Sequence, residues 1–196
     1  MSPNFPGPPV DLADFPVVEF SGPLYRIHLA DNDPWFFSST ARGRFNLTST
    51  AGLGTCYLST TEAGAFVEVF GDSQVIGAGL VSVRAISTAT VVDKLRLANV
   101  ADPKAIGTYG VSLAMSAHLD YGPTQQWATA FYGSGFDGIY YAARHDPSGA
   151  VRSVAVFGQA PLDPGRLAWA SPEQIPTWLI DQVALTYGIE VLPEIF

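Results

Sequence analysis

Alternation of apolar and polar residues predicts several short strands along this chain. Residues 24–29 alternate as Leu-Tyr-Arg-Ile-His-Leu, which is the period of a half-buried strand. Other short runs are rich in β-branched or aromatic side chains, which favour strands. On this basis we expect strands at residues 55–59, 80–86, 90–95, 139–141, 153–157 and 189–192.

Helical periodicity separates some of these strands. The segments with this pattern are residues 62–70, 125–132 and 173–187. Thr60 or Thr61 is placed to cap the first helix and Gly71 to end it, while Thr124 is placed to cap the second. In the first helix we expect the inward face to consist of Ala65, Phe66, Val69 and Phe70.

The order of these elements predicts a mostly β, α+β fold in one domain. Residues 1–23 contain six prolines, which block helix and lack a backbone donor, so we expect an extended N-terminal arm there. Residues 24–196 then form the domain. Residues 31–54 are rich in polar residues and glycine, and this predicts a long loop of the kind that often carries function.

Composition and charge exclude several classes of protein. The chain has 196 residues, 47% of them hydrophobic, which is enough for a full-sized core. Its net charge of −8 argues against direct nucleic-acid binding, which needs a basic face. No run approaches 18 apolar residues, so we expect no membrane span. The N-terminus lacks the pattern of a secretory signal, and the single Cys56 suits a reducing cytosol, so we expect a cytoplasmic protein.

Chemistry-bearing residues concentrate between positions 24 and 70. Arg26 lies within the first strand, Arg44 on the glycine-containing loop, Tyr57 on the second strand and Glu68 on the following helix. Each has a structural alternative: an ion pair for either arginine, a place in the core for the tyrosine, and an edge position for the carboxylate. The three histidines are far apart in sequence and Cys56 is alone, so no metal-ligand spacing exists.

Taken together, these residue types suit a phosphorylated aromatic ligand. The planar guanidinium of arginine binds phosphate oxygens in bidentate fashion. An aromatic ring stacks on a base or a nicotinamide, and a carboxylate stabilises positive charge that develops at a sugar carbon. These groups are the ones needed to break an N-glycosidic bond in a dinucleotide.

The ordered series of motifs resembles the RES domain family. The first part of the series is Leu24-Tyr25-Arg26, Gly43-Arg44-Phe45-Asn46, Cys56-Tyr57-Leu58-Ser59 and Ala65-Phe66-Val67-Glu68-Val69. The second part is Gly135-Phe136-Asp137-Gly138-Ile139-Tyr140-Tyr141, Arg144-His145-Asp146-Pro147 and Val154-Ala155-Val156-Phe157. Single motifs of this kind are weak, but their order and spacing are specific, and the resemblance covers about residues 24–158.

The resemblance implies a fold and an activity. RES domains have an ADP-ribosyltransferase-like fold, in which a split β-sheet with flanking helices surrounds an NAD-binding cleft. Several members are toxins of toxin–antitoxin pairs that consume NAD by hydrolysis or phosphorolysis, and an Xre-type helix-turn-helix antitoxin covers the cleft. NAD would thus be the substrate, with inorganic phosphate as a candidate co-substrate and no prosthetic group. A homodimer remains open on the sequence alone.

Site roles follow from the same resemblance, position by position. Arg26 and Arg44 would hold the NAD phosphates or the attacking phosphate, and Tyr57 would line the nicotinamide-ribose pocket. Glu68 would be the catalytic carboxylate, with Arg26 and Tyr57 as the other catalytic residues. The residues expected to support this site are Tyr25, Asn46 and Ser59. One position departs from the pattern, because Ala143 stands where the family serine is expected. Position 143 therefore lacks a hydroxyl whose hydrogen bond would contribute on the order of 1 kcal/mol.

Three functions are therefore compatible with the sequence. The first is an NAD glycohydrolase or NAD phosphorylase. The second is a transferase that places ADP-ribose on a protein, which would use the same pocket. The third is a catalytically silent NAD-binding or interaction module, and its main support is Ala143.

Overall fold

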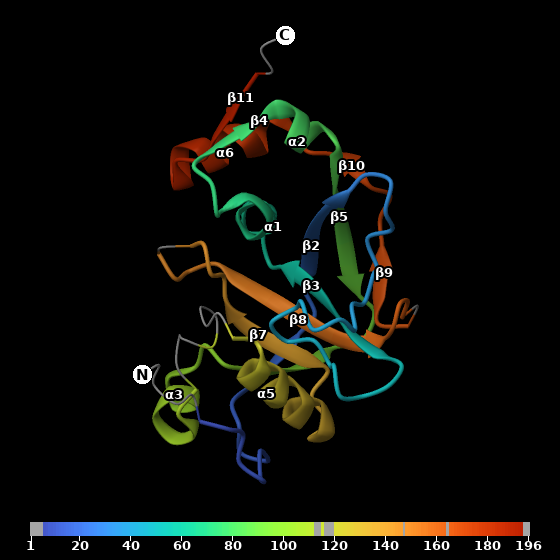
Figure 1. The fold of residues 1–196 in the computed structure, drawn as a ribbon, viewed down its shortest axis with the longest axis vertical. Helices are drawn as coiled ribbons and strands as arrows, with labels where there is room; N and C mark the ends of the chain where they lie inside the picture. Colours follow the sequence, from blue (N-terminus) through green and yellow to red (C-terminus); the bar gives the residue numbers. More distant parts are fainter. Residues whose placement is uncertain (1–5, 112–114, 116–119, 147, 164, 194–196) are drawn as a thin grey trace.

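A curled sheet of nine described strands forms the centre of the computed structural model (Figure 1). The structure describes residues 6–111, 115, 120–146, 148–163 and 165–193, so residues 1–5 of the predicted arm and Pro147 lie outside it. In sheet order the strands are β1 (Val17–Phe20), β6 (Leu95–Asn99), β7 (Gly138–Ala142), β8 (Arg152–Gln159), β3 (Leu53–Ser59), β2 (Pro23–Leu29), β5 (Arg84–Val91) and β10 (Glu173–Gln174), and β9 (Leu167–Trp169) also pairs with β5.

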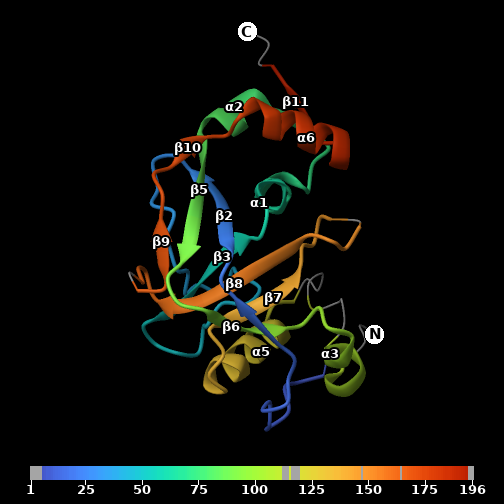
Figure 2. The same cartoon turned by 180° about the vertical axis from the view of Figure 1, so that it is seen from behind.

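The sheet splits between β2 and β3. β2 pairs with β5 along its whole length and β3 pairs with β8 along its whole length, but β2 and β3 meet only at Tyr25 and Ser59. Beyond this single pair the two strands diverge, and the sheet becomes two arms that run in different directions (Figures 1 and 2). This is the split sheet that the sequence predicted, and the fold class is α+β as expected.

Helices flank both arms of the sheet. They are α1 (Glu62–Phe70), α2 (Ala78–Ser82), α3 (Pro103–Tyr109), α5 (Gly122–Gly133) and α6 (Thr177–Tyr187), while β4 (Val75–Gly77) and β11 (Glu190–Leu192) form a separate two-stranded sheet. Helix α1 lies in the angle between the two arms, and α5 covers the outer side of β7 and β8 (Figures 1 and 2). None of the helices in the described ranges is long and apolar enough to cross a bilayer.

Helix α1 is positioned by its cap and by its apolar face. The Oγ1 atom of Thr61 accepts a hydrogen bond from Gly64 N at 3.0 Å, and Gly71 ends the helix, as predicted. Phe66 and Phe70 are buried, as expected, but the inward position predicted for Val69 is wrong, because Val69 is 39% exposed. It faces an open cavity at the split instead of the core.

The predicted strands at residues 80–86 and 90–95 are wrong in their boundaries. Residues Ala78–Ser82 form the short helix α2, and the strand begins at Arg84 and runs to Val91. Strand propensity reflects the fit of a side chain to a half-buried pleated surface. Leu80 and Val83 reach no such surface, since both are more than half exposed.

Two predicted helix starts are also wrong. The C-terminal helix begins at Thr177 instead of residue 173, because Glu173 and Gln174 pair with β5 as β10 and Pro176 takes the N-cap position. Helix α5 begins at Gly122, and the Thr124 hydroxyl donates to Arg44 O at 2.6 Å instead of capping a helix. Both departures come from contacts with distant segments.

The proline-rich arm packs onto the domain. Leu12 and Phe15 are buried in the core cluster that also contains Trp127 and Phe131 of α5. Residues Val17–Phe20 then join the sheet beside β6 as the edge strand β1. The arm therefore contributes to both the core and the sheet, while the division of the chain into an arm and a domain stays a prediction.

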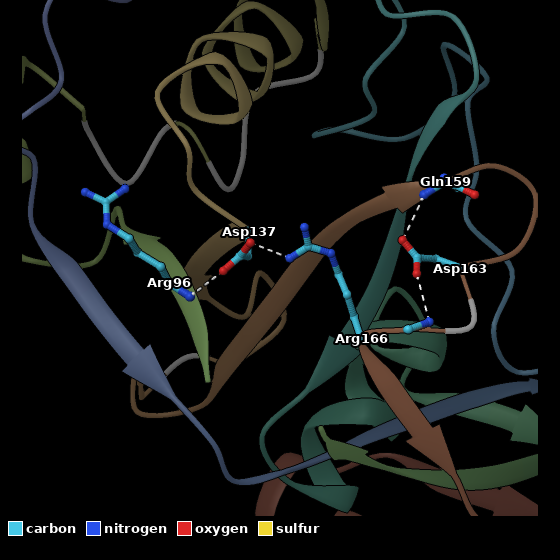
Figure 3. Close-up of polar contacts among 6 residues, drawn as sticks. Arg96, Asp137, Gln159, Asp163 and Arg166 are labelled. Carbon is cyan, nitrogen blue, oxygen red and sulfur yellow. Dashed lines mark hydrogen bonds and ion pairs between the residues drawn. The ribbon is translucent and has the colours of Figure 1, made fainter. Parts of the chain in front are cut away.

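Two aspartates tie the segment between β8 and β9 to the sheet (Figure 3). Asp137 accepts a hydrogen bond from Arg96 N at 2.8 Å and pairs with the guanidinium of Arg166. Asp163 accepts from the backbone N–H groups of Gln159 at 3.0 Å and Gly165 at 3.1 Å. Arg166 directly precedes β9, which pairs with β5 on the arm of the sheet that carries β2.

Candidate functional site

A cavity of about 280 Å³ opens where β2 and β3 diverge. Its walls come from four elements that are distant in sequence. The lining residues are Tyr25, Arg26 and Ile27 of β2, Tyr57, Leu58 and Ser59 of β3, Ala65, Glu68 and Val69 of α1, and Tyr141 of β7. The split therefore brings together five of the predicted site residues, namely Tyr25, Arg26, Tyr57, Ser59 and Glu68.

Glu68 provides the carboxylate of this cavity. It lies on α1 and is half-buried, with the apolar Phe66 and Val67 of the same helix fully enclosed. One carboxylate oxygen, Oε1, accepts a hydrogen bond from Ser153 Oγ at 3.0 Å. Among the described residues, Oε2 has no hydrogen-bond partner, so this oxygen is available to a ligand in the cavity.

Arg26 provides the positive charge. Its Nη1 donates to the backbone oxygens of Pro34 and Phe36, the latter at 3.2 Å, and lies 3.1 Å from Cys56 Sγ. These contacts connect the guanidinium to the loop that follows β2. Within the described parts of the chain no carboxylate forms an ion pair with Arg26, so the nearby protein leaves this charge uncompensated. A partly buried cation of this kind is suited to an anionic ligand.

Tyr57 connects the cavity to the loop before β3. Its hydroxyl accepts a hydrogen bond from Phe45 N at 2.8 Å and donates to Asn46 Oδ1 at 2.8 Å. Burial is the main reason that the pKa of this phenol is raised above the ordinary value of 10.0. The phenol therefore stays neutral and acts in the site as a ring and a fixed hydroxyl.

Arg44 and Asn46 are not among the residues that line the cavity, and Asn46 contacts the cavity residue Tyr57 from the preceding loop. The Nδ2 atom of Asn46 donates to Thr40 O at 2.7 Å and to Ser38 Oγ at 3.0 Å, which fixes the loop. A Cβ at Gly43 would come within 2.2 Å of the Asn46 side chain, so this close approach requires glycine. Asn46 therefore contacts the cavity residue Tyr57, and its predicted role in NAD binding stays a prediction.

The guanidinium of Arg44 is held by the segment before α5. It lies 4.7 Å from the centre of the Tyr121 ring, and its Nη1 donates to Met115 O at 3.2 Å. Burial lowers the pKa of Arg44, the nearby Tyr121 opposes this shift, and the charge of Arg144 adds to it. Arg44 and Arg144 therefore lie close enough to interact, and Arg44 carries its positive charge near Tyr57 and Tyr141 of the cavity.

Two further residues of the site were not predicted. Tyr141 lines the cavity from β7, and burial followed by the negative charge of Glu68 raises the pKa of its phenol. Ser153 is fully buried on β8 and donates to Glu68. Tyr141 lies within a stretch that resembles the RES family, which was a usable signal. Ser153 carries no local signal, because only the pairing of β8 with β3 and β7 places it near α1.

Ala143, which stands where the family serine is expected, is a buried residue next to β7. Ala143 is only 4% exposed, and its backbone N–H donates to Val151 O at 3.0 Å just beyond the end of β7. The hydroxyl that reaches Glu68 comes from Ser153, ten positions further along the chain. The carboxylate therefore has a hydroxyl partner although position 143 has none.

The split α+β sheet, with a carboxylate, an arginine and three tyrosines lining the cavity at the split, has the architecture that the resemblance to RES domains implied. A family model for the RES domain matches residues 23–179, so the chain belongs to the RES domain family. A search of curated proteins finds no match.

Among solved structures, one similar chain is from the crystal structure of the M. tuberculosis MbcT–MbcA toxin–antitoxin complex. The match has a TM-score of 0.64 at 20% sequence identity and covers 87% of this chain and 92% of that chain. At this identity the likeness establishes the fold, and it agrees with the fold class expected from the sequence.

Proposed function

We propose that this protein is an NAD-degrading enzyme that cleaves the bond between nicotinamide and ribose. The observation that carries the proposal is the placement of Glu68 and Arg26 on the same 280 Å³ cavity, from two different elements. One is a carboxylate with an available oxygen, and the other is a cation without an ion-pair partner in the described chain. Cleavage of an N-glycosidic bond between a phosphorylated ribose and a pyridinium ring uses both: the carboxylate faces the positive charge that develops on the sugar, and the cation binds phosphate.

The proposed reaction is dissociative. As the C–N bond lengthens, positive charge develops on the ribosyl carbon, and the carboxylate of Glu68 stabilises it. Nicotinamide leaves as a neutral molecule with the bonding electron pair. Water or inorganic phosphate then adds to the same carbon and loses a proton, which gives ADP-ribose or ADP-ribose-1″-phosphate. Tyr57 and Tyr141, which burial keeps neutral, provide the walls for the flat nicotinamide ring.

Arg26 and Arg44 have different roles in the proposed reaction. Arg26 lines the cavity and is assigned to the phosphates or to the attacking phosphate. Arg44 does not line the cavity, and we propose that it contributes through its charge near Tyr57 and by fixing the loop of residues 43–46. The membership of the RES family supports NAD as the substrate.

We also propose that the protein is the toxin of a toxin–antitoxin pair. RES family membership and the similarity to a chain of the MbcT–MbcA toxin–antitoxin complex support this role. The partner would be an Xre-type helix-turn-helix antitoxin that covers the split. Growth arrest on expression of the protein, relieved by its antitoxin or by Glu68→Gln, is the expected outcome; unimpaired growth with accumulation of folded wild-type protein contradicts the toxin role.

Product analysis tests the proposed enzyme directly. Purified protein is incubated with NAD in the presence and absence of inorganic phosphate, and the products are identified by mass. A glycohydrolase releases nicotinamide both with and without phosphate. A phosphorylase releases nicotinamide only when phosphate is present. Radiolabel from NAD that moves to protein in a cell extract would instead support a transferase. No nicotinamide release over hours, from protein that binds NAD in calorimetry, would support the silent binding module.

A further inference from the structure

The partner of the Glu68 carboxylate lies in the sheet beneath it. Ser153 Oγ donates to Glu68 Oε1 at 3.0 Å, across 85 positions of sequence. Ser153 lies on β8, where it is paired with Ser59 of β3 on one side and with Tyr141 of β7 on the other. Both of these neighbours line the cavity, whereas Ser153 is itself completely buried.

Burial decides what kind of role Ser153 has. A side chain with no exposed surface does not contact a molecule in the cavity. Its hydroxyl has a single proton to donate, and the structure directs that proton to the carboxylate. The Ser153 hydroxyl also interacts with the Tyr141 phenol, so it is linked to two groups that face the cavity.

The effect on Glu68 is to distinguish its two oxygens. A glutamate on a helix rotates about three side-chain bonds unless a neighbour restrains it. A hydrogen bond to a charged acceptor is stronger than one between neutral groups, so the bond to Ser153 holds Oε1 toward the sheet. Oε2, which has no partner among the residues described, then remains for the ligand. Small errors in the position of a catalytic group have large effects on rate.

We propose that Ser153 is a positioning residue that holds the Glu68 carboxylate in its reactive orientation. The proposal rests on the proposed function, because it assigns Ser153 to the reaction that Glu68 supports. It predicts an effect on turnover and not on substrate binding, since Ser153 does not reach the cavity. It also predicts that Ser153 has no effect on the rate once the carboxylate is absent.

The test is a double-mutant cycle on Ser153 and Glu68, with nicotinamide release as the readout. The variants are Ser153→Ala, Glu68→Gln and the double substitution, each shown to be folded by circular dichroism. We expect Ser153→Ala to lower kcat at least tenfold, about 1.4 kcal/mol of transition-state stabilisation, while KM stays within twofold. In the Glu68→Gln background, assayed at higher enzyme concentration, the same substitution should change kcat by less than twofold.

Two further variants separate positioning from stability. Ser153→Cys has nearly the same size and retains a weak donor, so its kcat should lie between those of wild type and Ser153→Ala. Ser87→Ala removes another buried serine hydroxyl from a strand, one that contacts His28 and does not line the cavity, and it should leave kcat unchanged.

The outcomes distinguish the two proposals. An unchanged kcat in Ser153→Ala, a rise in KM alone, or an equal loss with and without Glu68 would overturn the role of Ser153 while leaving the proposed function intact. Unchanged turnover in Glu68→Gln would overturn the catalytic assignment of Glu68 itself. If Ser153→Ala does not fold, Ser153→Cys provides the test. A wild-type kcat for Ser153→Cys, together with the same loss of kcat on adding Glu68→Gln as in the wild type, would contradict the proposal.

Discussion

The Tyr57 hydroxyl donates a hydrogen bond to Asn46 Oδ1 at 2.8 Å, and this bond joins the wall of the cavity to the preceding loop. The same hydroxyl accepts from Phe45 N at 2.8 Å. Asn46 is fully buried, so its side chain depends on such partners. The loop of residues 43–46 and the cavity are thus one structural unit.

We expect Tyr57→Phe to lower the free energy of unfolding by more than the removal of an exposed tyrosine hydroxyl does. The substitution removes the hydrogen-bond partner of the buried Asn46 Oδ1 and of Phe45 N, which costs about 1–3 kcal/mol. Urea denaturation measures the change in the free energy of unfolding. Tyr132→Phe, at a half-buried tyrosine of α5, is the matched control and should change stability much less. Equal effects of the two substitutions would contradict the structural role of Tyr57.

Glu68→Gln should reduce nicotinamide release from NAD at least a hundredfold. This factor corresponds to about 2.7 kcal/mol, which is reasonable for removing a full negative charge from beside a developing cation. The substitution keeps the size of the side chain, so the melting temperature should change little. Glu62→Gln, in the first turn of the same helix and outside the cavity, should retain activity. Loss of activity in both variants would point to the helix as a whole.

Arg26→Lys should weaken the binding of NAD while the protein stays folded. Lysine keeps the charge but loses the planar array of donors, which now contacts Phe36 O and Cys56 Sγ. We expect the Kd for NAD, measured by calorimetry, to rise at least tenfold. Arg84→Lys is the control, because Arg84 packs on the Phe70 ring and does not line this cavity. An unchanged Kd in Arg26→Lys would remove Arg26 from the phosphate site.

Alkaline pH should destabilise the protein through its buried thiol and phenols. Burial raises the pKa of Cys56 above 9.0 and the pKa values of Tyr57 and Tyr141 above 10.0. In the unfolded chain these groups ionise near their ordinary values, while in the folded protein they stay protonated. The stability they contribute is therefore fully present below pH 9 and declines as the pH rises beyond it.

Urea denaturation between pH 8 and 11 measures this decline. Cys56→Ala should make it less steep between pH 9 and 10, and Tyr57→Phe should do the same above pH 10. A flat stability profile up to pH 11 would be inconsistent with the burial of these groups.

Local sequence patterns were sufficient to predict the strands and the helix that carry the main site residues. The alternation around Arg26, the short run around Tyr57 and the capped helix around Glu68 each predicted an element that the structure contains. These patterns are local because side-chain periodicity and helix capping depend on neighbours within a few positions. Residues 80–82 were predicted as strand because residues 80–86 are rich in β-branched side chains, but they belong to the short helix α2, in which Leu80 is exposed and reaches no half-buried sheet surface.

The sequence by itself determined the α+β class, the elements that carry Arg26, Tyr57 and Glu68, and, through ordered motifs, the RES family. Only the tertiary structure decided that Arg44 does not line the cavity that Arg26, Tyr57 and Glu68 share, and that Ser153 donates to the carboxylate. The physical reason is that these relations depend on which distant strands pair. β8 pairs with β3 and β7 and so places Ser153 near α1, whereas β2 and β3 separate beyond the single pairing of Tyr25 with Ser59. Pairing between distant strands determines which side chains share a cavity, and a local pattern of residues does not encode it.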